Sequence, residues 1–148
     1  MTRIAKQSYI SIENEREFLM KRFMRLEDKH KAKIGSKGLF NSINEFMDYL
    51  NENCSDNGLS NVENKVYCLQ VGGKYLKVVT CLKDNVATGG GGSVYCFIDA
   101  KTGDIYKSAG WRAPYTKGKN AVRSNVMEDT YKTLDVRALR DGGWLYHR

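Results

Sequence analysis

The chain has 148 residues, of which 41% are hydrophobic and 28% charged, a composition that excludes the disordered class and allows one domain with a single core. The net charge of +7 is uneven, with +5 in residues 1–37, −3 in residues 38–100 and +5 in residues 101–148. Basic ends suggest a polyanionic partner, although many basic proteins carry solvated charge without a ligand.

We expect neither a secreted or membrane-spanning protein nor a protein that binds a metal ion or a cofactor. The first residues alternate basic, polar and apolar side chains and contain no apolar run of signal-peptide type, and no segment is long enough to span a bilayer. The cysteines form no CxxC pair and have only His30 and His147 as nitrogen partners, so we expect no metal site and no cofactor. The simplest reading of the thiols is that they are reduced packing residues; they are Cys54, Cys68, Cys81 and Cys96.

The N-terminal part, residues 1–58, is expected to be helical. Acidic residues precede basic ones after Ser11, and apolar residues recur every three or four positions, which predicts a helix over about 12–32 that ends at Gly35. A second helix follows from the apolar spacing between Leu39 and Cys54. Ser42 and Glu45 have capping-box spacing, but the apolar residues before them allow a start one turn earlier.

From Lys65 the apolar period changes to two, and residues 62–107 are expected to form the sheet. Gly72 and Gly73 predict a two-residue hairpin turn, which would place Leu69 opposite Leu76. One face of this hairpin is then apolar, with Tyr67, Leu69, Val71, Leu76 and Val78. The same register sets Cys68 opposite Lys77, about 13 Å from Cys81, which is too far for a disulfide.

Four consecutive glycines, 89–92, lead into a strand and lack the lysine and helix of a phosphate-binding loop, so we interpret them as a connection. The strand Val94–Ile98 is apolar on both faces and is expected to be central. A turn at Gly103 leads to a fourth strand, Ile105–Lys107. Residues 108–148 are expected to hold a basic loop, a short helix near 129–139, and an edge strand or docked tail at the end.

The fold class predicted from these elements is α+β. Two N-terminal helices are expected to pack on one face of an antiparallel sheet of four to five strands, within a single domain over residues 1–148.

The segment "VYCFIDAKTGDIYKSAGWRAP", residues 94–114, resembles a core found in small proteins of uncharacterised function encoded by tailed phages and other viruses. The resemblance covers residues 94–125 and departs from the pattern in the insert "YTKGKN". It implies a viral origin, hence a place in the host cytoplasm or the virion without secretion, and it implies no activity. The matching residues are Phe97, Ile98, Asp99, Gly103, Ile105, Lys107, Trp111, Arg112, Ala113, Pro114 and Arg123.

The stretch 107–123 carries the main functional prediction. It has five basic residues and no acidic one, and two aromatic side chains lie among them. Phosphates attract cations and unstacked bases stack on rings, so we expect a nucleic-acid interface, RNA or DNA, single- or double-stranded. The candidate residues are Lys107, Trp111, Arg112, Tyr115, Lys117, Lys119 and Arg123. The structural alternative is that Trp111 is a core anchor and the charges only solubilise a loop.

A second basic cluster lies on the first predicted helix, where Arg22, Arg25 and Lys29 would share one exposed stripe. It is either a solvated helix face or a second part of the interface, depending on whether it shares a side of the fold with the first. Another class also fits the basic ends: a virion or assembly protein that forms homo-oligomers through strand edges, or an accessory factor that binds a host protein.

Catalysis is not expected. Asp99 and Asp104 flank a tight turn, where carboxylates commonly accept turn hydrogen bonds, and His147 is near the terminus. A nucleophilic Cys96 would need a neighbouring base and is expected to be buried. No triad, paired carboxylates or metal-nuclease spacing is present in the sequence.

Overall fold

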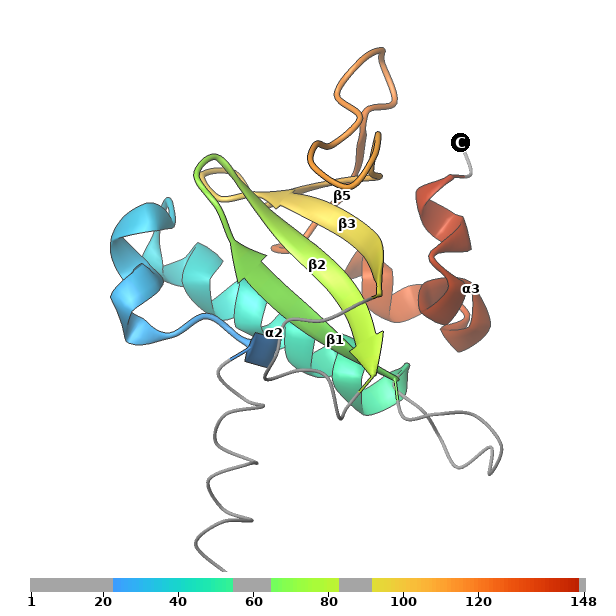
Figure 1. Ribbon diagram of the computed structural model, residues 1–148, viewed down its shortest axis with the longest axis horizontal. Coiled ribbons are helices and arrows are strands. Elements are labelled where there is room, and N and C mark those ends of the chain that lie inside the picture. The colour runs from blue at the N-terminus through green and yellow to red at the C-terminus, as the bar shows by residue number, and fades with distance from the viewer. Residues whose placement is uncertain (1–22, 55–64, 83–91, 147–148) are drawn as a thin grey trace, which may run out of the picture.

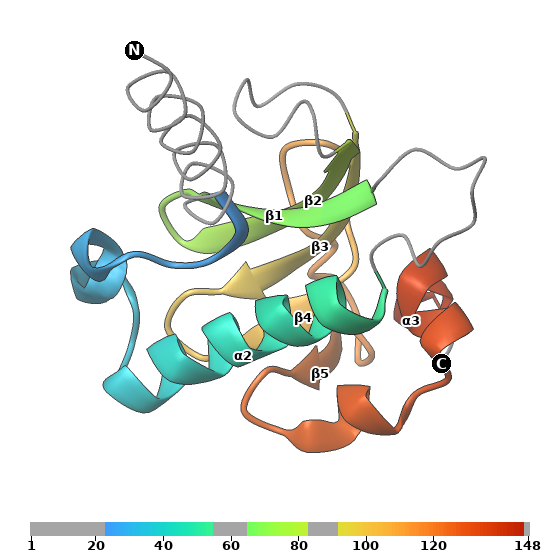
Figure 2. The same cartoon turned by 90° about the horizontal axis from the view of Figure 1, so that it is seen from below.

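The computed structural model describes residues 23–54, 65–82 and 92–146. One antiparallel sheet has the strand order β1-β2-β3-β4-β5, so each strand pairs with the next along the chain. The helix α2 lies across one face of this sheet, and the C-terminal helical elements lie beside it (Figures 1 and 2). The fold is therefore α+β. No helix among the described residues is long and apolar enough to cross a membrane.

The helix α2, Lys37–Asn53, has its N-cap six residues before Ser42, so it begins earlier than the capping-box spacing indicated, in the direction of the alternative start. Its N-cap is Ser36, whose Oγ accepts a hydrogen bond from the Leu39 N–H at 3.1 Å. The apolar residues recur on one side of the helix, and that side is buried against the sheet. They are Leu39, Phe40, Ile43, Phe46, Met47 and Leu50.

The prediction of a first helix over 12–32 is wrong from residue 25 onward; residues 23 and 24 are helical, and residues 12–22 lie outside the described ranges. The chain leaves the helical conformation at residues 25–27, and a separate 3-10 helix, η1, spans Asp28–Lys33. Leu26 is buried here, and its N–H donates to Asn44 Oδ1 of α2 at 2.7 Å. The Glu27 N–H donates to His30 Nδ1 at 3.0 Å, which starts η1 with a new cap. One helix of the described N-terminal part, α2, covers the sheet.

Gly35 follows η1, but its role differs from the predicted helix end. Its N–H donates to the Ala100 carbonyl at 2.9 Å, and a Cβ at this position would lie 2.3 Å from the Lys101 carbonyl oxygen. The close backbone approach between this segment and the β3–β4 turn therefore requires glycine.

The hairpin of β1, Lys65–Val71, and β2, Tyr75–Leu82, has the predicted faces but not the predicted register. Val71 pairs with Leu76 and Leu69 with Val78, a shift of two residues. Neither Gly72 nor Gly73 has a positive φ, so the two-residue primed turn does not form and four residues connect the paired positions. A shift of two preserves the alternation of faces, which is why the apolar pattern did not reveal it.

The new register also overturns the predicted separation of the hairpin thiols. Cys68 now pairs with Val79, and Val66 pairs with Cys81, so the two cysteines are diagonal neighbours on the same face. Their Sγ atoms lie 3.0 Å apart.

The strand β3, Ser93–Asp99, is central, as predicted, and is buried from Tyr95 onward. The register between β2 and β3 shifts at Val78 and Val79, where one extra residue of β3 forms a bulge. The bulge lets Tyr95 as well as Cys96 join the core. The strand β4, Asp104–Tyr106, follows after the Gly103 turn.

The sheet extends beyond residue 107 through an unpredicted edge strand, β5, Val122–Asn125. The region predicted as a short helix contains two elements: the 3-10 helix η3, Asp129–Thr133, and α3, Val136–Asp141. A further 3-10 turn, η4, Gly143–Leu145, takes the place of the suggested edge strand and docks by its buried Leu145. These elements close the core at the side of α2 (Figure 2).

Candidate nucleic-acid interface

The face of the sheet opposite α2, here called the outer face, carries a row of cationic and aromatic side chains. Lys77 of β2 pairs with Phe97 of β3, and Phe97 pairs with Tyr106 of β4. Directly paired residues project to the same side, so these three side chains cross three strands in a line. Tyr75, two residues before Lys77, is on the same face, and its ring meets the Tyr106 ring edge to face at 5.9 Å.

A short arm, residues 107–115, brings Trp111 to this row. The Tyr115 N–H donates to the Lys107 carbonyl at 2.9 Å, and the Ala109 N–H donates to the Ala113 carbonyl at 2.9 Å, which closes the arm with Trp111 in its tip. The Lys77 ammonium lies 4.2 Å from the centroid of the Trp111 ring and 6.0 Å from that of Phe97. Trp111 is nevertheless 50% exposed. The alternative of a buried Trp111 anchor is therefore wrong.

Beside Trp111 a groove of about 350 Å³ separates the β1–β2 turn from the arm. Its lining combines the β1–β2 turn with Phe97 of β3 and Arg112 of the arm. The lining residues are Gln70, Val71, Gly72, Gly73, Lys74, Tyr75, Lys77, Phe97 and Arg112. Phe97 is 3% exposed, so the groove offers three cations and the partly exposed ring of Tyr75, which matches the chemistry of a phosphate with a base beside it.

The cations of the groove repel one another. Burial lowers the pKa of Lys77 from its usual value, and the nearby positive charge of Arg112 lowers it further. In the part of the chain that the structure describes, no carboxylate forms an ion pair with Lys74, Lys77 or Arg112. A bound anion would relieve this repulsion, so the site favours negatively charged ligands.

The other residues predicted to bind nucleic acid in the stretch 107–123 are dispersed along the arm and the loop that follows it. The Lys107 ammonium lies over two rings, 4.7 Å from the Tyr115 centroid and 5.4 Å from the Tyr146 centroid. Tyr115 is 39% exposed. Lys117 and Lys119 are exposed in the loop, and Arg123 lies half-buried on β5.

Of the second basic cluster, Arg25 is not brought to the outer face. Arg22 lies outside the described residues, and Lys29 is exposed on η1. Arg25 lies at α2, which covers the opposite face of the sheet, and its Nη2 is 3.4 Å from Asp48 Oδ2.

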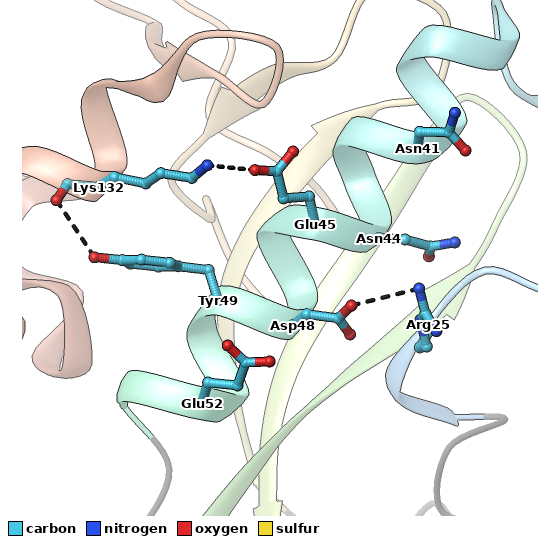
Figure 3. Close-up of a pocket in the computed structure, with 8 residues that line it drawn as sticks. All are labelled: Arg25, Asn41, Asn44, Glu45, Asp48, Tyr49, Glu52 and Lys132. Carbon is cyan, nitrogen blue, oxygen red and sulfur yellow. Dashed lines mark hydrogen bonds and ion pairs between the residues drawn. The ribbon is translucent and has the colours of Figure 1, made fainter.

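Arg25 lines a second pocket, of about 470 Å³, on the solvent side of α2 (Figure 3). Carboxylates dominate this pocket, and ion pairs join Arg25 to Asp48 and Lys132 to Glu45. An acidic, internally paired surface does not suit a polyanion. The lining residues are Arg25, Asn41, Asn44, Glu45, Asp48, Tyr49, Glu52 and Lys132.

The turn carboxylates have the structural role that the sequence suggested. Asp99 Oδ1 accepts hydrogen bonds from the N–H groups of Lys101 and Thr102, at 2.8 and 3.1 Å. Asp104 accepts from Thr102 Oγ1 and from Asn125 Nδ2. Cys96 is fully buried, and burial raises its pKa. Among the described residues, no group of three or more His, Cys, Asp or Glu side chains is placed to hold a metal ion.

Sequence reasoning missed the part of the interface that β2 contributes. Lys77 and Tyr75 were treated only as strand residues, although the alternation that buries Leu76 and Val78 also projects Tyr75 and Lys77 to the other face. The signal was therefore present: a lysine and an aromatic residue at alternate positions of a strand that is apolar on its other side. What connects them to Trp111 is the fold of the arm, which no local pattern specifies.

Comparison with known proteins adds a family and no activity. Residues 15–147 match DUF7717, which is described as a family of unknown function. No curated protein and no solved structure matches the chain. Since the match spans nearly all of the sequence, including the outer face and the arm, the chain belongs to the DUF7717 family.

Proposed function

We propose that the protein binds single-stranded nucleic acid on its outer face, with bases stacked on exposed rings and phosphates held by the groove cations. The observation that carries the proposal is the half-exposed Trp111 indole, held 4.2 Å from the Lys77 ammonium beside the Arg112 groove. Aromatic residues on a sheet surface, flanked by cations, are a recurrent means of binding unpaired bases.

The distribution of ion pairs supports this surface over the others. Two basic residues that line the pocket on α2 have carboxylate partners: Arg25 has Asp48, and Lys132 has Glu45 and Asp129. Lys74, Lys77 and Lys107, at the β1–β2 turn, the outer face and the arm, lie over aromatic rings and form no ion pair with a carboxylate of the described residues, whereas Lys132, which also lies over a ring, is paired. A lysine on a ring keeps its charge available to a third group, whereas a lysine paired with a carboxylate is largely neutralised.

A flat face also favours single strands over a duplex. Bases in a duplex are stacked on one another and do not offer their faces to a protein ring, whereas unpaired bases do. The RNA or DNA identity of the ligand is decided by the experiment below. The viral origin, and with it a host-cell or virion location, rests on the resemblance of residues 94–125.

Assembly is a second candidate function, supported by the strand at the end of the sheet. In the described residues β5 is the last strand of the sheet, and its Val122 is 47% exposed. An edge strand with an exposed apolar residue can pair with another copy of the chain. Size-exclusion chromatography with light scattering tests this role, since it separates a monomer from a closed oligomer or polymer.

The nucleic-acid proposal is tested by fluorescence anisotropy with single-stranded and duplex DNA and RNA of equal length, each at two salt concentrations. The double variant Lys77→Gln, Arg112→Gln removes two cations from the groove. We expect tighter binding to single strands, and a salt slope that is smaller by about 1.4 in the variant because each lost phosphate contact contributes about 0.7.

The matched control is the double variant Lys29→Gln, Lys33→Gln, which removes the same charge from exposed positions of η1. Because the control changes net charge equally, it separates a local contact from a general electrostatic effect. Equal losses in the two variants, or equal affinity for duplex and single strand, would reject the outer face as the binding site.

A further inference from the structure

The outer face has a second half, which is apolar in the part of the chain that the structure describes. Val66 and Cys68 of β1 and Val79 and Cys81 of β2 form a separate buried cluster there, with the partly buried Met24 packed against it. The Cys68 and Cys81 residues are 5% and 8% exposed, so each keeps a small opening to solvent. This thiol pair, Cys68 and Cys81, plays no part in the proposed nucleic-acid site.

The geometry of the thiol pair is close to that of a disulfide. The two cysteines are diagonal neighbours across an antiparallel strand pair, and their Sγ atoms are 3.0 Å apart. A disulfide bond is about 2.05 Å long, so an approach of about 1 Å would join the two sulfur atoms.

The hydrogen bond between the thiols makes them chemically unequal. Either sulfur can be the donor, and with Cys68 as the donor the bond, together with burial, raises the pKa of Cys68, while the bond lowers that of Cys81. The thiolate is the nucleophile in thiol–disulfide exchange. We assign Cys81 as the attacking group because it is also the more exposed of the two residues, 8% against 5%, and Cys68 is then placed to resolve the product.

We propose that Cys68 and Cys81 are a redox-modification site, a dithiol that closes to an intramolecular disulfide when the protein meets a small disulfide such as oxidised glutathione. The Cys81 thiolate attacks one sulfur of glutathione disulfide and forms a mixed disulfide, and one glutathione leaves as a thiolate. Cys68 then loses its proton and attacks the Cys81 sulfur of the mixed disulfide, and the second glutathione leaves. Two protein thiols are oxidised, and one glutathione disulfide is reduced to two glutathione molecules.

The other two cysteines supply an internal comparison. Cys54 and Cys96 are 1% and 0% exposed and lie in the main core cluster on the α2 side of the sheet. Burial raises the pKa of both thiols. They are therefore expected to stay reduced under conditions that oxidise the thiol pair.

Closing the bond links an edge strand to its neighbour. The disulfide would close a short loop that contains the β1–β2 turn. A disulfide that closes a loop lowers the conformational entropy of the unfolded chain and so stabilises the folded protein. For a chain of this length the expected rise in melting temperature is about 10 °C.

The test incubates the folded protein with glutathione disulfide, blocks the remaining thiols with an alkylating reagent, and measures intact mass and a non-reducing peptide map. We expect the loss of two hydrogen atoms, a peptide link between Cys68 and Cys81, and alkylation of Cys54 and Cys96 only after denaturation. The melting temperature should rise and return to its first value with a reducing agent.

Single variants report the order of attack. Cys68→Ser lacks the resolving thiol and should accumulate one glutathionyl adduct on Cys81, whereas Cys81→Ser should accumulate far less. Wild-type protein that stays fully reduced when folded, but forms disulfides once unfolded in guanidinium, would overturn the proposal and leave the thiols as packing residues. A peptide link that involves Cys54 or Cys96 would overturn it as well.

Discussion

The ammonium group of Lys77, on the second strand of the sheet, lies 4.2 Å from the ring centroid of Trp111, which is 34 positions later in the chain. This contact joins the sheet to the arm, and Lys77 also lines the groove between the β1–β2 turn and Arg112. Because Lys77 covers one side of an indole that is half exposed, a stacked base and a bound phosphate would meet at the same place.

Removing the Trp111 ring should therefore weaken binding without loss of stability. We expect Trp111→Ala to reduce affinity for a single strand by about 5-fold to 150-fold, because stacking contributes about 1–3 kcal/mol per base. The melting temperature should change little, since half of the residue is already in solvent. Anisotropy titration and thermal melting measure the two effects, and Trp111→Phe, which retains a ring, should keep part of the affinity.

Tryptophan fluorescence should report binding from one of the two indoles. Trp144 is half-buried, and its Nε1 donates to Tyr95 Oη at 2.8 Å, whereas Trp111 is exposed. A single-stranded oligonucleotide should quench the emission of a Trp144→Phe protein and leave that of a Trp111→Phe protein nearly unchanged. Quenching confined to the protein that retains Trp144 would place the ligand elsewhere.

The pH dependence of binding should reflect Lys77. Burial and then the charge of Arg112 lower its pKa, so the lysine loses its proton at a pH below that of an ordinary lysine. Phosphate binding needs the charged form, and affinity should be constant near neutral pH and fall as the pH rises through this lowered value. Nuclear magnetic resonance titration of the lysine side chains measures the pKa of Lys77. Arg112→Ala should raise the pKa of Lys77 only in part, since burial remains, and a bound oligonucleotide should also raise it.

The Tyr95 hydroxyl should be important for stability. It donates to the Leu139 carbonyl and accepts from the Trp144 indole, and burial raises the pKa of the phenol. Tyr95→Phe removes both hydrogen bonds: the Leu139 carbonyl keeps only the Gly142 N–H, at 3.3 Å, and the half-buried Trp144 indole N–H loses its partner. We expect a cost of about 1–3 kcal/mol in the free energy of unfolding. Urea denaturation measures the loss. Tyr146→Phe, at a position that is 57% exposed, is the matched control and should have little effect.

The Gly103 turn should tolerate no side chain. Its φ is +81°, and an added Cβ would lie 2.6 Å from Leu39 Cδ1 of α2 and 3.0 Å from Val126 Cγ2. Backbone strain and overpacking should together make Gly103→Ala less stable by about 2–5 kcal/mol. Gly110→Ala is the control, because φ is not positive there and a Cβ would meet open space. Equal stability of the two variants in urea would contradict this account of the turn.

Much of the fold was predictable because burial is periodic. The faces of α2, β1, β2 and β3 follow from alternation or helical spacing, and the turn carboxylates follow from their positions beside Gly103. The short strand β5 was missed because its four residues, "VRSN", include one apolar side chain and carry no alternating signal. The end of the first predicted helix was missed because Asn44, which is far from Leu26 in sequence, binds that backbone and stops the helix.

The candidate site was predicted only in part for a related reason. Charge and aromatic content identified the arm, and the structure places Trp111 at the surface. The partner of Trp111 on β2 was not identifiable, since it depends on how the arm folds over the sheet. The thiol pair was misplaced because a hairpin register can shift by two residues without changing which side chains are buried.

The neighbour-to-neighbour strand order has a kinetic consequence. Because each strand pairs with the one before it, the sheet can grow hairpin by hairpin, and no strand must cross over another to find its place. Short loop closures carry a small entropic penalty, so refolding after dilution from denaturant should be rapid for a protein with this amount of β-structure. The α2 helix, made of local contacts, would then meet a surface that is already assembling.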